Sequence, residues 1–277
     1  MNNRNNNLET ICIASKHIPL LDQLELKVIG SGCQSKPENY YPENWIKDNS
    51  FENISNKNLH FGTLTSHYWI WKNLVDKINT NKWIAICHYR RFWVQSGCEK
   101  NTNIHNLKEN ILKDVPLEFS QYDALLPPLV NLKNMKKIKI IKKGFRNLIK
   151  DPLIIFNKTK YTVSFHFDLF HGYKLLDKAA KVMNKEDQND FIKYIKTSNT
   201  FYPFQIFISK PLIMKKLYTK TFEWINECEK IFKDEKLTGY GKTRIYDFLA
   251  ERYFSFWFTK YTKIKILPFI FLDIEKI

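Results

Sequence analysis

The pattern of apolar and polar positions alternates between short strands and longer helices. Strands are predicted where short, largely apolar runs are bounded by polar or turn residues. These runs are Thr10–Ala14, Leu26–Ile29, Trp83–Cys87, Tyr122–Leu126, Gln205–Ser209 and a stretch near Lys265–Leu267. Because strands and helices alternate along the chain, the pattern predicts an α/β fold, in which helices flank a central, mostly parallel sheet.

Apolar residues at helical spacing predict the helices. The predicted helices are Thr63–Ile78, Asn106–Lys113, Asp168–Met183, Asp187–Lys196, Pro211 to about Phe232, and Tyr246–Phe258. Residues 34–58 are polar and carry two prolines, so we expect a loop there. For 277 residues we predict a single domain, 1–277, with an insert-like segment at 131–160.

Charge distinguishes that segment from the rest of the chain. The formal net charge is +16, and residues 131–160 alone hold ten basic residues and one acidic residue. Apolar residues lie between the lysines, so the segment could lie on an anionic membrane surface with apolar side chains inserted. The alternative is a solvated segment without a partner.

Cysteine usage and targeting signals indicate the compartment. The chain has five cysteines and no C-x-x-C pair, which disfavours both a disulfide framework and a zinc ribbon. The N-terminal residues are polar, which predicts no signal peptide, and no run approaches the roughly 20 apolar residues of a membrane-spanning helix. We expect a cytoplasmic protein, or one peripheral to the inner face of the cytoplasmic membrane.

The common nucleotide and metal motifs are absent. The sequence has no phosphate-binding P-loop, no G-x-G-x-x-G and no H-E-x-x-H. It also lacks the Asp-x-Asp pair that holds a divalent cation against a pyrophosphate, and we predict no metal ligands. His166 and His171 are five apart, a spacing that does not place them on one helix face. No run combines basic and stacking aromatic residues, so nucleic acid is not an expected partner.

One strand leads directly into cationic chemistry. The apolar run from Trp83 ends in His88, Arg90 and Arg91. Ligands of open α/β sheets bind at the carboxyl ends of strands, and guanidinium groups bind phosphate oxygens in pairs. This strand end is therefore a candidate phosphate or pyrophosphate site. The alternative is that both arginines pair with surface carboxylates and that His88 belongs to the core.

Four sequence motifs follow one another along the chain. They are Asp48-Asn49 with Asn53-Ile54-Ser55 and Leu64-Thr65 leading into WIWKN at 69–73, CHYRRF at 87–92, Phe204 to Met214, and FLAER at 248–252 with Trp257. Together, in this order, they resemble a family of bacterial glycosyltransferases of capsular, exopolysaccharide and lipopolysaccharide clusters. That domain was long known only as one of unknown function, and some members look like galactofuranosyltransferases. The chain departs from the family pattern at Thr63, where glutamate is usual, and at Asp247, where glycine is usual.

The resemblance implies a GT-A-like fold and transfer of a sugar from a nucleotide sugar, UDP-linked and in one version UDP-galactofuranose. The acceptor would be a saccharide or a lipid-linked saccharide, and arginines would replace part or all of the role of a metal. The expected donor and phosphate-binding residues are His17, Thr65, Lys72, His88, Arg90, Arg91 and Arg252.

If the reaction inverts, a carboxylate must accept the proton of the acceptor hydroxyl. The candidates are Glu251 and Asp168. Glu251 could instead anchor its helix by pairing with Arg244 or Lys242, and Asp168 could instead cap the helix that follows it. The competing functional class is a non-catalytic basic protein that binds a membrane surface or nucleic acid.

Overall fold

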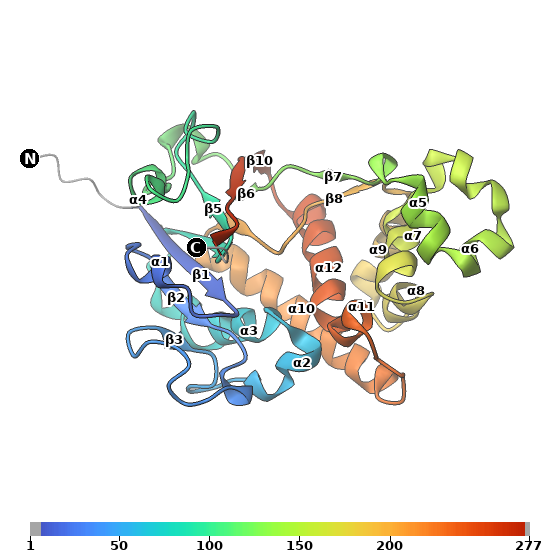
Figure 1. Cartoon of the computed structure of the whole chain (residues 1–277), viewed down its shortest axis with the longest axis horizontal. Coiled ribbons are helices and arrows are strands. Elements are labelled where there is room, and N and C mark those ends of the chain that lie inside the picture. Colours follow the sequence, from blue (N-terminus) through green and yellow to red (C-terminus); the bar gives the residue numbers. More distant parts are fainter. Residues whose placement is uncertain (1–6, 275–277) are drawn as a thin grey trace, which may run out of the picture. The chain divides into compact units, whose positions relative to one another are not determined.

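The computed structural model describes residues 7–274, apart from the side chain of Tyr240. The chain divides into two compact units (Figure 1). The first unit runs up to Pro128 and also includes Gln205–Thr219 and the residues from Phe258 on, and the second consists of Leu129–Phe204 and Lys220–Trp257. Segment 131–160 lies wholly in the second unit. A single domain over 1–277 stays a prediction.

The first unit contains the main sheet. Its strands are β1 Leu8–Ala14, β2 Lys27–Gly30, β3 Ile46–Lys47, β4 Trp83–His88, β5 Arg91–Trp93, β6 Ala124–Leu126, β9 Phe207–Ser209, β10 Ile264–Ile266 and β11 Phe269–Phe271. Its helices are α1 Pro19–Asp22, α2 Asn58–Phe61, α3 Leu64–Asn73 and α4 Leu107–Asn110, together with the start of α10 (Pro211–Phe232) and the end of α12 (Ile245–Tyr261).

The strand order is β10-β6-β9-β4-β1-β2-β3. β9 runs antiparallel to both of its neighbours, β4 and β6, and the other pairs along this path are parallel. β5 turns back on β4 and pairs with β11. The predicted α/β class, with a mostly parallel central sheet, is confirmed.

β4 lies inside this sheet, between β9 and β1, and all of its residues are buried. It pairs in parallel with β1 from Leu8↔Trp83 to Ile13↔His88. A strand that is buried on both faces needs an apolar run rather than an alternating pattern, which is why this run was readable in the sequence. β3 lies in the predicted loop at 34–58, and its two residues are too few to show a periodic pattern.

Two predicted helices of the first unit are shorter than their patterns. α3 ends at Asn73, because the backbone of Leu74 leaves helical geometry before a 3-10 turn at Val75–Lys77. α4 ends at Asn110, because Ile111 pairs with Val94 instead. At α4, tertiary pairing overrides a weak helical pattern.

The second unit is mainly helical. It contains β7 Val130–Asn131, α5 Lys137–Lys143, α6 Phe145–Lys150, α7 Val163–Phe170, α8 Leu175–Ala180, α9 Lys185–Thr197, β8 Thr200–Phe201 and α11 Tyr240–Thr243, with the remaining parts of α10 and α12. The observed α10 has the predicted bounds. The core of the second unit includes the packed rings of Phe191, Trp224, Tyr253 and Phe256. The hydroxyl of Tyr253 donates a hydrogen bond of 2.9 Å to the buried carboxylate of Asp187.

The predicted continuous helix Asp168–Met183 is wrong. The helix α7 begins earlier, where the hydroxyl of Thr162 accepts from the backbone N–H of Phe165, and it ends at Phe170. Gly172 then takes a φ of +121°, and Lys174 a φ of 61°, before α8 begins. The chain turns at these left-handed residues, which an apolar pattern cannot reveal. Among the described residues, no helix has both the length and the apolar character needed to cross a bilayer.

Candidate functional site

The candidate residues fall into two groups, one in each unit. His17, Thr65, Lys72, His88, Arg90 and Arg91 belong to the first unit, and Asp168, Glu251 and Arg252 belong to the second. In the first unit β1, β2 and β4 are parallel, so their carboxyl ends lie at one edge of the sheet. This edge is where ligands of open α/β sheets bind.

The buried carboxylate of Asp48 organises the loop that follows β2 at this edge. It accepts hydrogen bonds from the backbone N–H groups of Gly32 (2.8 Å) and Cys33 (2.9 Å) and from the hydroxyls of Ser55 (2.6 Å) and Thr65 (2.7 Å). Gly32 has a φ of +71°, a conformation that favours glycine. The first sequence motif thus forms one hydrogen-bond network. Thr65, which the sequence analysis expects to bind the nucleotide-sugar donor, is fully buried within this network.

Sequence reasoning missed Lys36 at this edge. Its ammonium donates to the backbone oxygen of Ser15 and to the hydroxyl of Tyr41, and lies 4.1 Å from the ring centre of Tyr40. Burial lowers its pKa. Lys36 lines a cavity of about 390 Å³ together with Lys47 and others. The only sequence signal would have been a lysine between the glycines that close β2 and Pro37.

His17 follows β1 but is engaged locally. Its Nε2 lies 2.9 Å from Oδ2 of Asp22, and its ring meets that of Trp45 edge-on at 5.4 Å. Lys72, on α3, pairs with Glu52 at 3.0 Å and lies over the ring of Trp71. Both side chains therefore have partners within the protein.

The end of β4 forms a tight hairpin. His88 pairs with Arg91, the first residue of β5, so Tyr89 and Arg90 form the turn. The guanidinium groups of both arginines lie over the ring of Phe271, at 5.7 Å for Arg90 and 5.6 Å for Arg91. The structure thus gathers the three predicted groups at one strand end. The chain turns back there as β5, so Arg91 belongs to a strand of the sheet.

In the second unit, Arg252 lies at the centre of a buried cluster. Its side chain is 1% exposed and pairs with Glu251. Its Nη2 also donates to Nδ1 of His166 (3.1 Å) and to Nε2 of His171 (3.4 Å). The guanidinium lies 4.1 Å from the ring centre of Phe201. Glu251 is therefore paired with Arg252 and not with Arg244 or Lys242, and its Oε1 accepts from the backbone N–H of Phe204 at 2.6 Å.

The two histidines of this cluster are neutral. Burial, followed by the charge of Arg252, lowers the pKa of His166 to about 3 and that of His171 to about 2. Because guanidinium only donates, Nε2 of His171 must accept, which leaves its Nδ1–H to donate to the carbonyl oxygen of Gly241 (3.3 Å). The structure brings the two rings within 6.0 Å of each other, although their spacing does not predict a shared helix face.

Asp168 lies near the end of α7 and does not cap a following helix. Its Oδ1 accepts from the backbone N–H of Lys174 (2.8 Å), and its Oδ2 accepts from the side-chain amide of Asn147 (3.3 Å). Burial raises the pKa of this carboxyl. Asp168 thus closes the turn after α7 and ties it to α6.

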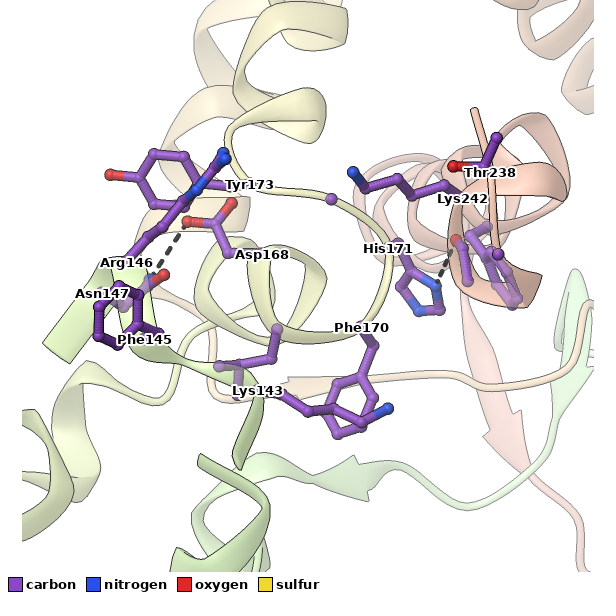
Figure 2. Close-up of a pocket in the computed structure, with 15 residues that line it drawn as sticks. Lys143, Phe145, Arg146, Asn147, Asp168, Phe170, His171, Tyr173, Thr238 and Lys242 are labelled. Atoms are coloured by element: carbon purple, nitrogen blue, oxygen red, sulfur yellow. Dashed lines mark hydrogen bonds between the residues drawn. The ribbon is translucent and has the colours of Figure 1, made fainter. Parts of the chain in front are cut away.

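Asp168 and His171 also line a cavity of about 800 Å³ (Figure 2). Arg146 and Asp168 lie on the left of the view, and Lys242 and His171 lie on the right. The full lining is Lys143, Phe145, Arg146, Asn147, Asp168, Leu169, Phe170, His171, Gly172, Tyr173, Thr238, Gly239, Gly241, Lys242 and Phe248. Within the described residues, no group of three or more His, Cys, Asp or Glu side chains is arranged to hold a metal ion.

Comparisons with known proteins agree with this architecture. A solved structure of the apo form of WbbM, described as a bifunctional glycosyltransferase, matches with a TM-score of 0.69 and 17% sequence identity. The match covers 97% of this chain and 46% of that one, so this chain spans about half the length of WbbM. At this identity the likeness shows the fold, and the GT-A-like fold class is confirmed.

No curated protein matches the chain. The family model for the domain of unknown function DUF4422 matches residues 10–263, which is most of the sequence. The chain therefore belongs to the DUF4422 family.

Proposed function

We propose that the protein is a glycosyltransferase that moves a sugar from a nucleotide-sugar donor to a saccharide or lipid-linked acceptor in surface polysaccharide synthesis. One observation carries the proposal: His88, Arg90 and Arg91 meet at the carboxyl end of β4, at the edge where β1 and β2 also end. The likeness in fold to a structure named as a glycosyltransferase supports it.

The chemistry of this edge suits a nucleoside diphosphate leaving group. Breaking the bond to the donor sugar leaves negative charge on the diphosphate, and preorganised cations stabilise that charge most where water is excluded. Arg90 and Arg91 are partly buried and rest on the Phe271 ring, which limits their motion. Guanidinium groups held in this way bind phosphate oxygens in pairs, and Lys36 adds a third cation at the edge.

Asp168 and Glu251 remain the candidates for the base. Both carboxylates accept hydrogen bonds through both oxygens, but Glu251 is also paired with the buried guanidinium of Arg252 and does not line the cavity, which favours a positioning role for it. Asp168 lines a cavity, and its raised pKa moves it toward the range of a general base. Asp168 is therefore the preferred candidate, and Asp168→Asn should abolish transfer while Glu251→Gln should also lower stability.

The donor is tested by following UDP release across a panel of UDP sugars, including UDP-galactofuranose, with and without divalent metal. We expect one sugar to stand out and Arg90→Ala or Arg91→Ala to lower turnover about 100-fold or more, about 3 kcal/mol in the barrier. The matched control is Lys82→Ala, an exposed cation of the same unit. Unchanged turnover in both arginine variants would refute the assignment.

Thermal stabilisation separates this function from its competitor. A nucleotide-sugar enzyme should be stabilised by UDP at saturation, and the shift should persist at moderate salt. A non-catalytic basic protein would instead be stabilised by oligonucleotide or polyphosphate, and that shift would disappear as salt rises.

We also propose that segment 131–160 holds the protein on the anionic inner face of the cytoplasmic membrane. Six large apolar side chains of this segment are exposed: Ile138, Ile141, Phe145, Ile149, Leu153 and Phe156. They alternate with ten basic residues and one acidic residue. The free energy of membrane binding is the sum of apolar insertion and attraction to anionic lipid. The attraction contributes about 1 kcal/mol for each basic residue near the surface.

Vesicle flotation tests the membrane contact. We expect the protein to float with vesicles that contain about 30% anionic lipid and not with neutral vesicles. The variant Phe145→Ser/Ile149→Ser/Phe156→Ser should lose flotation and keep its UDP-induced stabilisation. Equal flotation of this variant and the wild type would contradict the proposal.

A further inference from the structure

The cavity of the second unit brings three cations to one space. Lys143 ends α5 and Arg146 lies on α6, the next helix along the chain, whereas Lys242 comes from α11, far away in the sequence. Figure 2 shows Lys242 extending from one side, opposite Arg146 and Asp168, with Lys143 below. The cavity has a volume of about 800 Å³, large enough for a small organic ligand.

These cations are not neutralised by the protein. Within the described part of the chain, none of Lys143, Arg146 and Lys242 forms an ion pair with a carboxylate. Asp168, the one carboxylate among the described lining residues, accepts hydrogen bonds from the backbone N–H of Lys174 and the side-chain amide of Asn147. By contrast, Lys174, outside the lining, pairs with Asp177 at 2.8 Å. The lining therefore has an excess of positive charge that favours an anion.

Aromatic rings lie beside two of these cations in the lining. The ammonium of Lys143 lies 4.5 Å from the ring centre of Phe170, and the guanidinium of Arg146 lies 5.7 Å from that of Tyr173. These contacts hold the cations beside apolar surface and reduce their solvation. The lining thus suits a ligand that carries an anionic group on an apolar or ring-shaped body.

On the side of the cavity that carries Lys242, the backbone of α11 packs closely against the end of α7. A Cβ added at Gly241 would come within 1.9 Å of the carbonyl oxygen of Phe170, so α11 can approach the end of α7 only with glycine there. The Nδ1–H of His171, which donates to Gly241, fixes the same approach. The position of Lys242 therefore follows from packing within the second unit.

We propose that this cavity binds the phosphate or diphosphate group of the acceptor, as an ester of a saccharide or of a lipid. Arg146 and Lys242 hold the phosphate oxygens, and Phe145, Phe170 and Tyr173 contact the body of the ester. Lys143, Phe145 and Arg146 also belong to the membrane-contacting segment 131–160, which places the cavity beside that surface. The acceptor role rests on the proposed glycosyl transfer, whereas the binding itself does not.

Calorimetry on the full chain tests the binding with three probes: inorganic pyrophosphate, a hexose 1-phosphate and a short prenyl diphosphate. Saturating UDP is present throughout, so that the proposed donor edge is occupied. We expect Arg146→Ala/Lys242→Ala to weaken binding of the preferred probe at least tenfold, because charge-assisted hydrogen bonds are lost. The matched control, Lys196→Ala, removes an exposed cation of α9 outside the cavity and should leave binding unchanged.

The source of the phosphate follows from the probe that binds best. Tightest binding of the prenyl diphosphate indicates a lipid-linked ester, and tightest binding of the hexose phosphate indicates a soluble one. Failure of all three probes to bind the wild type, or equal binding by wild type and the double variant, would overturn the proposal. Arg90→Ala should retain this binding and lose turnover, so failure of the transferase proposal is distinguishable from failure of this one.

Discussion

The central buried charges of the two units, Asp48 in the first and Arg252 in the second, are held by different means. In the first unit the carboxylate of Asp48 accepts four hydrogen bonds from neutral donors, whereas in the second unit the guanidinium of Arg252 shares one carboxylate and two neutral imidazoles. A network of neutral donors satisfies its charge without a counter-ion, and each donor loses its partner if the charge is removed. A paired charge instead depends on one oppositely charged neighbour. The comparison predicts that the first unit loses more stability than the second when its central charged residue is replaced.

The largest effect is expected at Asp48. Asp48→Ala leaves four donors without their acceptor, at about 1–3 kcal/mol each, so we expect a loss of at least about 4 kcal/mol in the free energy of unfolding. Urea denaturation measures it. Asp76→Ala is the control, since this exposed carboxylate pairs with Lys215 and should change stability by less than about 1 kcal/mol. Equal losses in the two variants would show that the network does not hold the loop.

At Arg252 we expect a loss of about 3 kcal/mol. Arg252→Met leaves Glu251 without its cation in a largely buried position, which destabilises strongly. The double variant Glu251→Gln/Arg252→Met should recover part of that loss, because the orphaned charge is gone. A double-mutant cycle by urea denaturation measures the coupling, and additive single losses would mean that the pair is not coupled.

Acid should weaken both units through their neutral histidines. Burial lowers the pKa of His67 in the first unit to about 3, as it does for the pair in the second. A folded-state pKa below the unfolded value of about 6.5 means that the unfolded chain takes up protons first as pH falls. Stability is then complete above about pH 6.5 and declines below it, by about 1 kcal/mol per histidine between pH 6.5 and 5.5.

Urea denaturation at the two pH values measures that slope. His171→Phe should reduce the slope by about a third, and Leu59→Ala, at an exposed residue that does not titrate, should leave it as in the wild type. If His171→Phe keeps the full slope, this imidazole is not neutral in the folded protein.

The smallest effect on stability is expected at Lys72. Its ion pair with Glu52 is exposed, so Lys72→Ala should change the free energy of unfolding by at most about 0.5 kcal/mol. If Lys72 approaches the donor, the KM for the nucleotide sugar rises several-fold while stability is kept. An unchanged KM would remove Lys72 from the proposed donor site, which would then consist of the groups at the carboxyl end of β4.

Much of the fold could be predicted because burial and helix starts leave local signals in the sequence. The apolar run of β4 and the proline that opens α10 gave those elements directly. The hairpin after His88, the two-residue β3 and the break after α7 were not readable, because each depends on a turn or a pairing partner elsewhere. The cations at the end of β4 were predicted from the sequence, whereas Lys36 and Lys242 were not.

By itself, the sequence determined the α/β class, the candidate strand end and the location of the excess charge at 131–160. Those features depend on local order: apolar runs, adjacent cations and a count of charges. Only the tertiary structure decided that Asp48 gathers four donors, that His166 and His171 meet at Arg252, and that Lys143, Arg146 and Lys242 share a cavity. Such groups come together through packing between distant segments, and a single sequence carries no local signal for it.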